Sequence, residues 1–143
     1  PYKLIGNHWF WKRSSRGMDG AQTVELDFIS SMASPKYNSS KAFVTIDGIL
    51  GLQTINKIDG IYIAADDSEV PLAIAVNDES MTRVKSGFLE TPWFLDIPMV
   101  NVLAETKNFQ LWGYFSEKHK RVRIGKSFSL DHSKINITSD YSQ

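Results

Sequence analysis

The chain has 143 residues, of which 42% are hydrophobic and 12% aromatic, enough to bury the core of one domain. Sixteen basic residues balance sixteen acidic ones, and a net charge of zero disfavours a dedicated nucleic-acid-binding protein. The chain contains no cysteine, which excludes disulfides, thiolate metal sites and cysteine nucleophiles.

We predict that residues 1–143 form a single β-rich domain, because the chain has no internal repeat, no low-complexity tract and no long linker. No run of about 18 apolar residues occurs, so we expect no membrane span. The chain begins at Pro1 rather than at methionine, and we expect a preceding segment to have been removed.

The first half of the chain alternates apolar with polar residues, the period of strands that have one buried face. The predicted strands cover residues 8–13, 22–30, 41–47, 49–55, 60–65 and 70–77. Residues 14–20 and 30–40 are predicted loops, and the Asp-Gly pairs at 47–48 and 59–60 are predicted turns. Pro71 places its strand at a sheet edge or delays its start.

A further strand is predicted at 82–89, interrupted by Gly87, and the period changes after it. Residues Met99, Val102 and Leu103 recur at helical spacing, and Asp96 can serve as the N-cap. We therefore predict one short helix near 97–106, although the valines in this stretch also permit a strand.

After this helix, residues 109–115 return to the period of a strand, which we predict to be central. Two short strands at 121–124 and 126–130 follow, separated by Gly125, and residues 131–143 are predicted to be a frayed tail. The predicted fold is mainly β: an antiparallel β-sandwich or flattened barrel with one short helix near 97–106.

No catalytic motif is recognisable in the sequence, so we expect neither enzymatic activity nor a cofactor. The three histidines, His8, His119 and His132, are far apart in sequence and have no ligand partner at helical or strand spacing. We therefore predict no metal site.

Basic residues cluster beside aromatic ones in the C-terminal third of the chain. The candidate interaction surface comprises Trp112, Tyr114, Lys118, Lys120, Arg121, Arg123 and Lys126. Cations beside stacking aromatics on a β-surface are the arrangement by which proteins hold single-stranded nucleic acid, and an exposed Trp/Tyr set also suits a protein interface. The same pattern fits a charged hairpin on a solvated sheet face, with the two aromatic residues in the core.

Four segments, taken in order, resemble parts of small exported bacterial proteins. They are HWFWKRSS at 8–15, MDGAQTVELDF at 18–28, PLAIAVND at 71–78 and VNVLAETKNFQLWGYF at 100–115. The resemblance is to the type VI secretion-associated VasI-like proteins and to the invasion-associated locus B family. It implies a periplasmic β-sandwich that acts by binding, without catalysis, and it assigns no site residues.

The leading functional hypothesis is a non-enzymatic protein-binding module, an exported accessory or immunity-type protein of a bacterial secretion or competition system whose partner is another protein. We expect a periplasmic or otherwise exported location, with the cytoplasm as the alternative. The alternative function is a single-stranded nucleic-acid-binding β-barrel that uses the basic hairpin at 118–126. A hydrolase without a recognisable motif is a third hypothesis. The sequence does not fix the oligomeric state.

Overall fold

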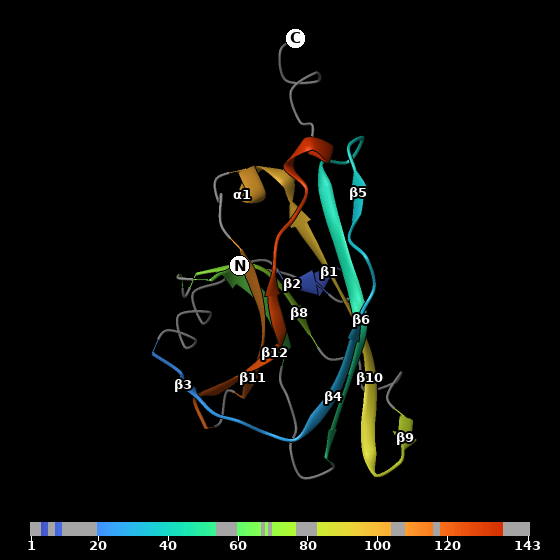
Figure 1. Cartoon of the computed structure of the whole chain (residues 1–143), viewed down its shortest axis with the longest axis vertical. Helices are drawn as coiled ribbons and strands as arrows, with labels where there is room; N and C mark the ends of the chain where they lie inside the picture. Colours follow the sequence, from blue (N-terminus) through green and yellow to red (C-terminus); the bar gives the residue numbers. More distant parts are fainter. Residues whose placement is uncertain are drawn as a thin grey trace.

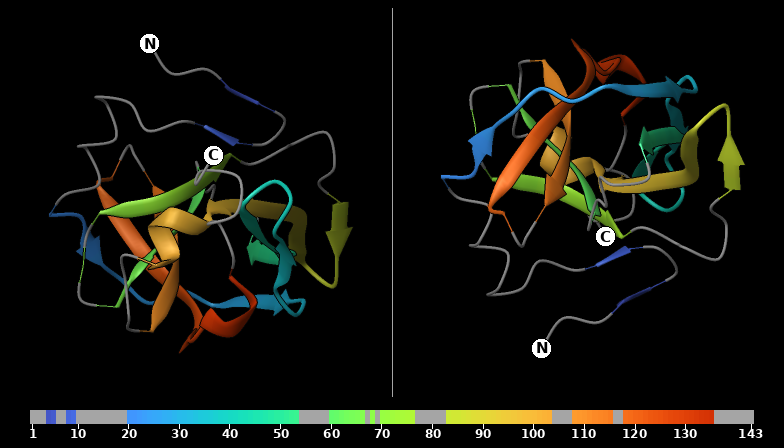
Figure 2. Two further views of the ribbon diagram at one scale, coloured as in Figure 1. Left: turned by 90° about the horizontal axis from the view of Figure 1, so that it is seen from above. Right: turned by 90° about the horizontal axis from the view of Figure 1, so that it is seen from below.

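The computed structural model describes residues 4–5, 8–9, 20–53, 60–66, 68, 70–76, 83–103, 108–115 and 118–135. These residues form two β-sheets (Figures 1 and 2). The main hydrophobic core lies between the sheets. The predicted mainly β fold, a sandwich or flattened barrel with one short helix, is confirmed. Within the described residues, no helix has the length and apolar character needed to span a membrane.

The larger sheet has seven strands in the order β1-β2-β8-β7-β11-β12-β3. Their bounds are β1 Leu4–Ile5, β2 His8–Trp9, β3 Gln22–Thr23, β7 Gly60–Ala65, β8 Pro71–Val76, β11 Phe109–Phe115 and β12 Lys120–Phe128. Neighbouring strands are antiparallel except β3 and β12, which are parallel. The predicted central strand at 109–115 is confirmed, because β11 lies between β7 and β12.

The smaller sheet has five strands, with the order β4-β6-β10-β9 and β5 also paired to β6. Their bounds are β4 Phe28–Met32, β5 Lys36–Asn38, β6 Phe43–Gln53, β9 Arg83–Lys85 and β10 Phe88–Pro98. Strands β6 and β10 have eleven residues each and pair along their whole length (Figure 1). This pair supplies the backbone of the smaller sheet.

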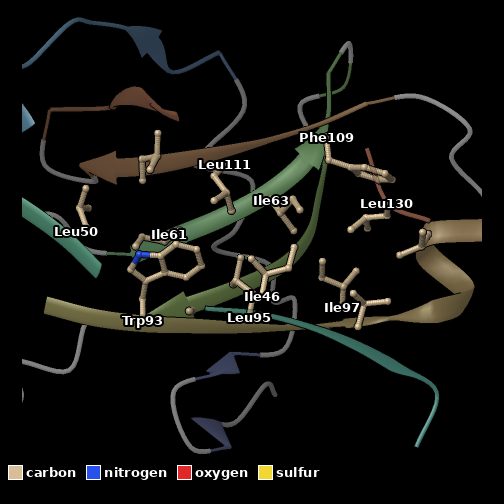
Figure 3. Packing of buried hydrophobic residues seen from close by; sticks show 14 of the residues in the cluster. Ile46, Leu50, Ile61, Ile63, Trp93, Leu95, Ile97, Phe109, Leu111 and Leu130 are labelled. Atoms are coloured by element: carbon tan, nitrogen blue, oxygen red, sulfur yellow. The ribbon is translucent and has the colours of Figure 1, made fainter. Parts of the chain in front are cut away.

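The core lies between the facing sides of the two sheets. In Figure 3, Trp93, Leu95 and Ile97 of β10 point toward Ile63 of β7 and Leu111 of β11. The alternate residues of β10, at positions 92, 94, 96 and 98, are only half-buried. Burial therefore alternates with a period of two along β10, because successive side chains of a strand point to opposite faces and only one face lies against the core.

The predicted turn at Asp47-Gly48 is wrong, and so is the division of 41–55 into two strands. Both residues lie inside β6, where Gly48 pairs with Trp93 on one side and with Met32 on the other. A Cβ on Gly48 would collide with the carbonyl oxygen of Ser31 and lie 2.9 Å from the Trp93 ring. Glycine is therefore needed here for close approach of a neighbouring strand rather than for a turn.

The predicted strand at 22–30 is two strands, β3 in the larger sheet and β4 in the smaller one. Residues 24–27 cross between the sheets and keep the expected alternation, with Val24 and Leu26 half-buried and Glu25 and Asp27 exposed. The predicted loop at 30–40 instead contains the end of β4 and all of β5.

The predicted helix begins later than expected, because α1 spans Met99–Leu103 and the ladder of β10 with β6 continues to Pro98. Asp96 is consequently a strand residue, not an N-cap, and its Oδ1 accepts a hydrogen bond of 2.6 Å from the Thr45 hydroxyl. Residues 104–106 of the prediction lie outside the described residues.

Two glycines predicted to interrupt strands have other roles. Gly87, with φ of +83°, follows Ser86, with φ of +52°, in the tight turn between β9 and β10, as the twist of a two-residue hairpin requires. Gly125, with φ of +70°, lies inside the continuous strand β12 where its register with β11 shifts. The buried Gln110 amide donates to the Ile124 and Gly125 carbonyls at 3.3 and 3.1 Å, which satisfies this bulge.

The predicted tail at 131–143 is not frayed at its start. Residues His132–Lys134 form a 3₁₀ turn, and Ile135 is buried in the core. The Asp131 backbone N–H donates to the Tyr37 hydroxyl at 2.8 Å, which attaches this turn to β5. Residues 136–143 lie outside the described residues.

Of the other predictions, the strand at 60–65 is confirmed, and the strand at 70–77 starts at Pro71, one of the two outcomes expected from that proline. Only 8–9 of the predicted strand 8–13 are described, as β2. The loop at 14–19 and Asp59 of the second predicted turn lie outside the described residues.

We predict that Gly48→Ala destabilises the fold by about 1–3 kcal/mol, because the new methyl group meets a backbone carbonyl that cannot move alone. Gly51→Ala, in the same strand, is the matched control, since its Cβ meets the Ile29 side chain at 2.6 Å and that partly exposed side chain can rotate away. Urea denaturation followed by circular dichroism measures both. Equal losses for the two variants would contradict the steric explanation.

The Asp131 carboxylate caps the 3₁₀ turn, and hydrogen bonds from the Ser133 hydroxyl and then from its backbone N–H lower the pKa of Asp131 below its ordinary value of 3.8. Since the pKa is lower in the folded state, the stabilisation is fully present above pH 3.8 and is lost as the pH falls through the folded-state pKa.

We therefore expect Asp131→Ala to lower the melting temperature at pH 7, with a difference from the wild type that shrinks below pH 3.8. Asp131→Asn is the control, because the amide can still cap the turn but carries no charge to titrate. Thermal denaturation across this pH range decides the matter, and a difference that stays constant with pH would count against the carboxylate's role.

Candidate interaction surfaces

The β11–β12 hairpin carries most of the predicted site residues on the outer side of the larger sheet. Trp112 lies opposite Arg123 on β12 and opposite Tyr62 on β7, while Tyr114 lies opposite Arg121. Cross-strand partners project to the same face of a sheet and come into side-chain contact. The pairing register thus brings these residues together.

Trp112 is buried beneath its neighbours, with only 2% of its surface exposed. The Tyr62 ring stacks beside it at 6.4 Å between centroids, with 18° between the ring planes. The guanidinium carbons of Arg121 and Arg123 lie 3.8 and 4.5 Å from the centre of the indole ring. These are cation–π distances, so both arginines are attracted to the ring that they cover.

Arg121 also ties three strands together. Its Nε donates to the Thr23 hydroxyl of β3 at 3.2 Å, and its Nη1 donates to the Tyr62 hydroxyl of β7 at 3.2 Å. Both of these acceptors are hydroxyl groups, and they come from two different strands. Arg121 is therefore placed as a clamp on the outer face of the larger sheet.

Tyr114 is 8% exposed and contacts His119, which lies in the turn before β12. The Tyr114 hydroxyl is 3.5 Å from His119 Nδ1, and the two rings meet edge to face at 86°. The His119 carbonyl accepts a hydrogen bond from the Gln22 N–H at 3.1 Å, and this bond links the turn to β3. Tyr114 thus belongs to the packed outer cluster.

Of the two alternatives left open for Trp112 and Tyr114, an exposed surface or the core, the structure shows burial. Their strand is central, and its outward-facing rings are covered by side chains of neighbouring strands. A nucleic-acid base could stack on Trp112 only by displacing Arg121 and Arg123. Single-stranded nucleic-acid binding by the hairpin stays a prediction, but it lacks the exposed ring on which it was based.

The predicted cations do not form one surface. Lys118, Arg123 and Lys126 are exposed, whereas Lys120 and Arg121 are half-buried. Lys118 and Lys120 line a small cavity of about 110 Å³ with residues of the crossing segment 24–27, on the side of the sheet away from Trp112. Lys118 and Lys120 therefore lie on a different face of the sheet from Arg121 and Arg123.

A second surface, which the sequence did not predict, lies on the outer side of the smaller sheet. It is a groove of about 660 Å³ lined by Ser31, Ala33, Thr45, Asp47, Gly48, Ile49, Pro92, Trp93 and Phe94. Ile49 is 42% exposed, and Pro92 and Phe94 are half-buried. We call this feature the β6–β10 groove.

Two polar pairs border the β6–β10 groove. The Thr45 hydroxyl donates to Asp96 at 2.6 Å, and Lys36 lies 3.5 Å from Asp47 in an exposed ion pair. The alternation of Asp47 and Ile49 with core residues is visible in the sequence. The groove was nevertheless missed, because 47–48 was assigned to a turn and 96–98 to a helix.

Among the described residues, no three histidine, aspartate or glutamate side chains gather closely enough to hold a metal ion. A third groove, of about 620 Å³, runs along Thr23–Phe28 with Gln53, Val122 and Arg123. Comparison of the chain with protein-family models, with curated proteins and with solved structures gives no match.

We predict that Arg121→Ala lowers the free energy of unfolding by about 2 kcal/mol, through loss of the cation–π contact and two hydrogen bonds. Arg123→Ala is the control, because Arg123 is exposed and lies farther from the ring, and we expect a loss of about 1 kcal/mol or less. Urea denaturation compares them. If Arg123→Ala is the more damaging variant, the clamp assigned to Arg121 is refuted.

Proposed function

We propose that this protein is a non-enzymatic protein-binding module whose partner docks on the β6–β10 groove. The observation that carries this proposal is the apolar character of an open sheet face: Ile49, Pro92 and Phe94 line the groove, and none of them is fully buried. Apolar residues gathered on an accessible surface are a feature of protein interaction sites.

The surroundings of the groove resemble the anatomy of a protein interface, in which an apolar centre is bordered by polar groups. The Thr45–Asp96 and Lys36–Asp47 pairs supply that border. Because their charges are already partnered or hydrogen-bonded, a docking protein would not leave these carboxylates without a partner. The groove lies on a paired β-ladder and is therefore preformed, which limits the entropy lost on binding.

The sequence resemblance to small exported bacterial proteins supports a more specific role. We propose an exported, periplasmic accessory or immunity-type protein of a bacterial secretion or competition system, which acts by occupying its partner. In such a role a rigid sheet face that recognises one protein is sufficient, and no catalytic group is required.

Ile49→Lys tests the groove, since it places a charge among the apolar residues that line it. We expect the variant to lose its partner, with a drop in affinity on the order of tenfold or more. The matched control is Val84→Lys on β9, which introduces the same charge at a residue that is 70% exposed and does not line the groove.

The measurement is co-purification from native lysate, followed by titration of the recovered protein against purified wild type and variants. Circular dichroism confirms that both variants keep the fold. Recovery of a partner that binds Ile49→Lys as tightly as wild type would refute the groove. Failure to recover any specific protein would refute the function.

A further inference from the structure

The strand β4 lies at an edge of the smaller sheet, on the periphery of the molecule (Figure 2). Among the described strands it pairs with β6 alone. The Ala33 N–H donates to the Asp47 carbonyl at 2.9 Å. This bond identifies the residues of the β4–β6 ladder that form hydrogen-bonded pairs. Because such pairs alternate, Ile29 and Ser31 bond to β6, whereas Phe28, Ser30 and Met32 direct their N–H and C=O groups outward.

Within the described residues, the outward edge of β4 lacks the usual protection. Edge strands are normally guarded by lysine, proline, a bulge or a covering loop. The sequence of β4, Phe-Ile-Ser-Ser-Met, has no charge and no proline, and its register with β6 is unbroken. All residues from Ile29 to Met32 are exposed, and in the described part of the chain no hydrogen bond reaches the outward backbone groups of Ser30 and Met32.

Two of the exposed large hydrophobic side chains belong to this one strand: Ile29 is 43% and Met32 is 40% exposed. An edge that offers both unpaired backbone groups and apolar side chains is a template for another strand. The strand has five residues, so the added strand must be short or must be the end of a longer one.

We propose that β4 pairs antiparallel with β4 of a second copy of this chain, about a two-fold axis through Ser30. In this register Ser30 faces Ser30 of the second copy, Phe28 faces Met32 and Ile29 faces Ser31. The alternation of hydrogen bonds gives about six new backbone bonds. The two five-stranded sheets thereby join into one continuous sheet.

A second copy suits this edge because the strand is self-complementary. The contact about a two-fold axis uses the same patch on both molecules, so any charge near the axis would face itself. The five residues of β4 carry none.

The pairing also covers the exposed side chains. Met32 packs beside Phe28 of the second copy, a sulfur–aromatic contact, and Ile29 packs over Ser31. An interface of one short strand is small, so the dimer is weak, with a dissociation constant on the order of tens of micromolar. Dimerisation therefore rises steeply with protein concentration.

Sedimentation velocity of the full chain from about 5 to about 500 µM tests the proposal. The wild type is expected to shift from the 16.2 kDa monomer toward twice that mass. Ser30→Lys and Ser30→Asp each place like charges opposite one another at the axis, and each variant alone is expected to weaken dimerisation about tenfold or more. An equimolar mixture of the two is expected to restore the dimer, because opposite charges then face each other.

Ser30→Thr and Val84→Lys are the controls, and both should dimerise as the wild type does. Circular dichroism tests whether each variant is folded. The concentration series of the wild type tests dimerisation without any variant, so it remains valid if a variant does not fold. A wild type that stays monomeric to 500 µM, an unaffected Ser30→Lys dimer, or a mixture that does not dimerise would each overturn the proposal. In the first case the edge is free for a strand of a different protein.

Discussion

The pairing of β6 with β10 is the constraint on which the rest of the structure depends. Eleven residues of each strand pair in one unbroken register, which runs from the pair Phe43 and Pro98 to the pair Gln53 and Phe88. This ladder decides which residues of both strands face the core, because a slip of one residue would exchange the two faces. The positions of β4, β5 and β9 follow from it, since each pairs with one of the two strands.

The two sheets use their outer faces differently. On the larger sheet, Trp112 and Tyr62 form a second packed cluster that Arg121 clamps to β3 and β7. On the smaller sheet, Ile49 and Phe94 remain at the surface between polar pairs. The first face is a packed layer, and the second leaves apolar side chains accessible to solvent.

Much of the fold could be predicted from the sequence where the residues on the two faces of a strand differ in character and alternate along the chain. The strands at 60–65 and 109–115 were found this way. Gly48 misled the prediction, because glycine marks both tight turns and close approaches of strands, and only the position of Ser31 separates them. Pro98 and Asp96 look like a helix start, but the ladder with β6 holds the backbone extended. The burial of Trp112 depends on residues of four other segments. A local sequence pattern does not indicate that these segments lie beside Trp112.

Two of the four tryptophans, Trp93 and Trp112, lie in different layers, each with a buried indole N–H that has no acceptor among the described residues. Trp93 is surrounded by aliphatic core residues, whereas Trp112 lies under two guanidinium groups. The two indoles therefore experience different electric fields and are expected to differ in fluorescence. Once Trp9 and Trp11 are replaced, Trp93 becomes an intrinsic optical reporter for the interior and Trp112 one for the outer layer, so partial unfolding of the layers can be followed without any added label.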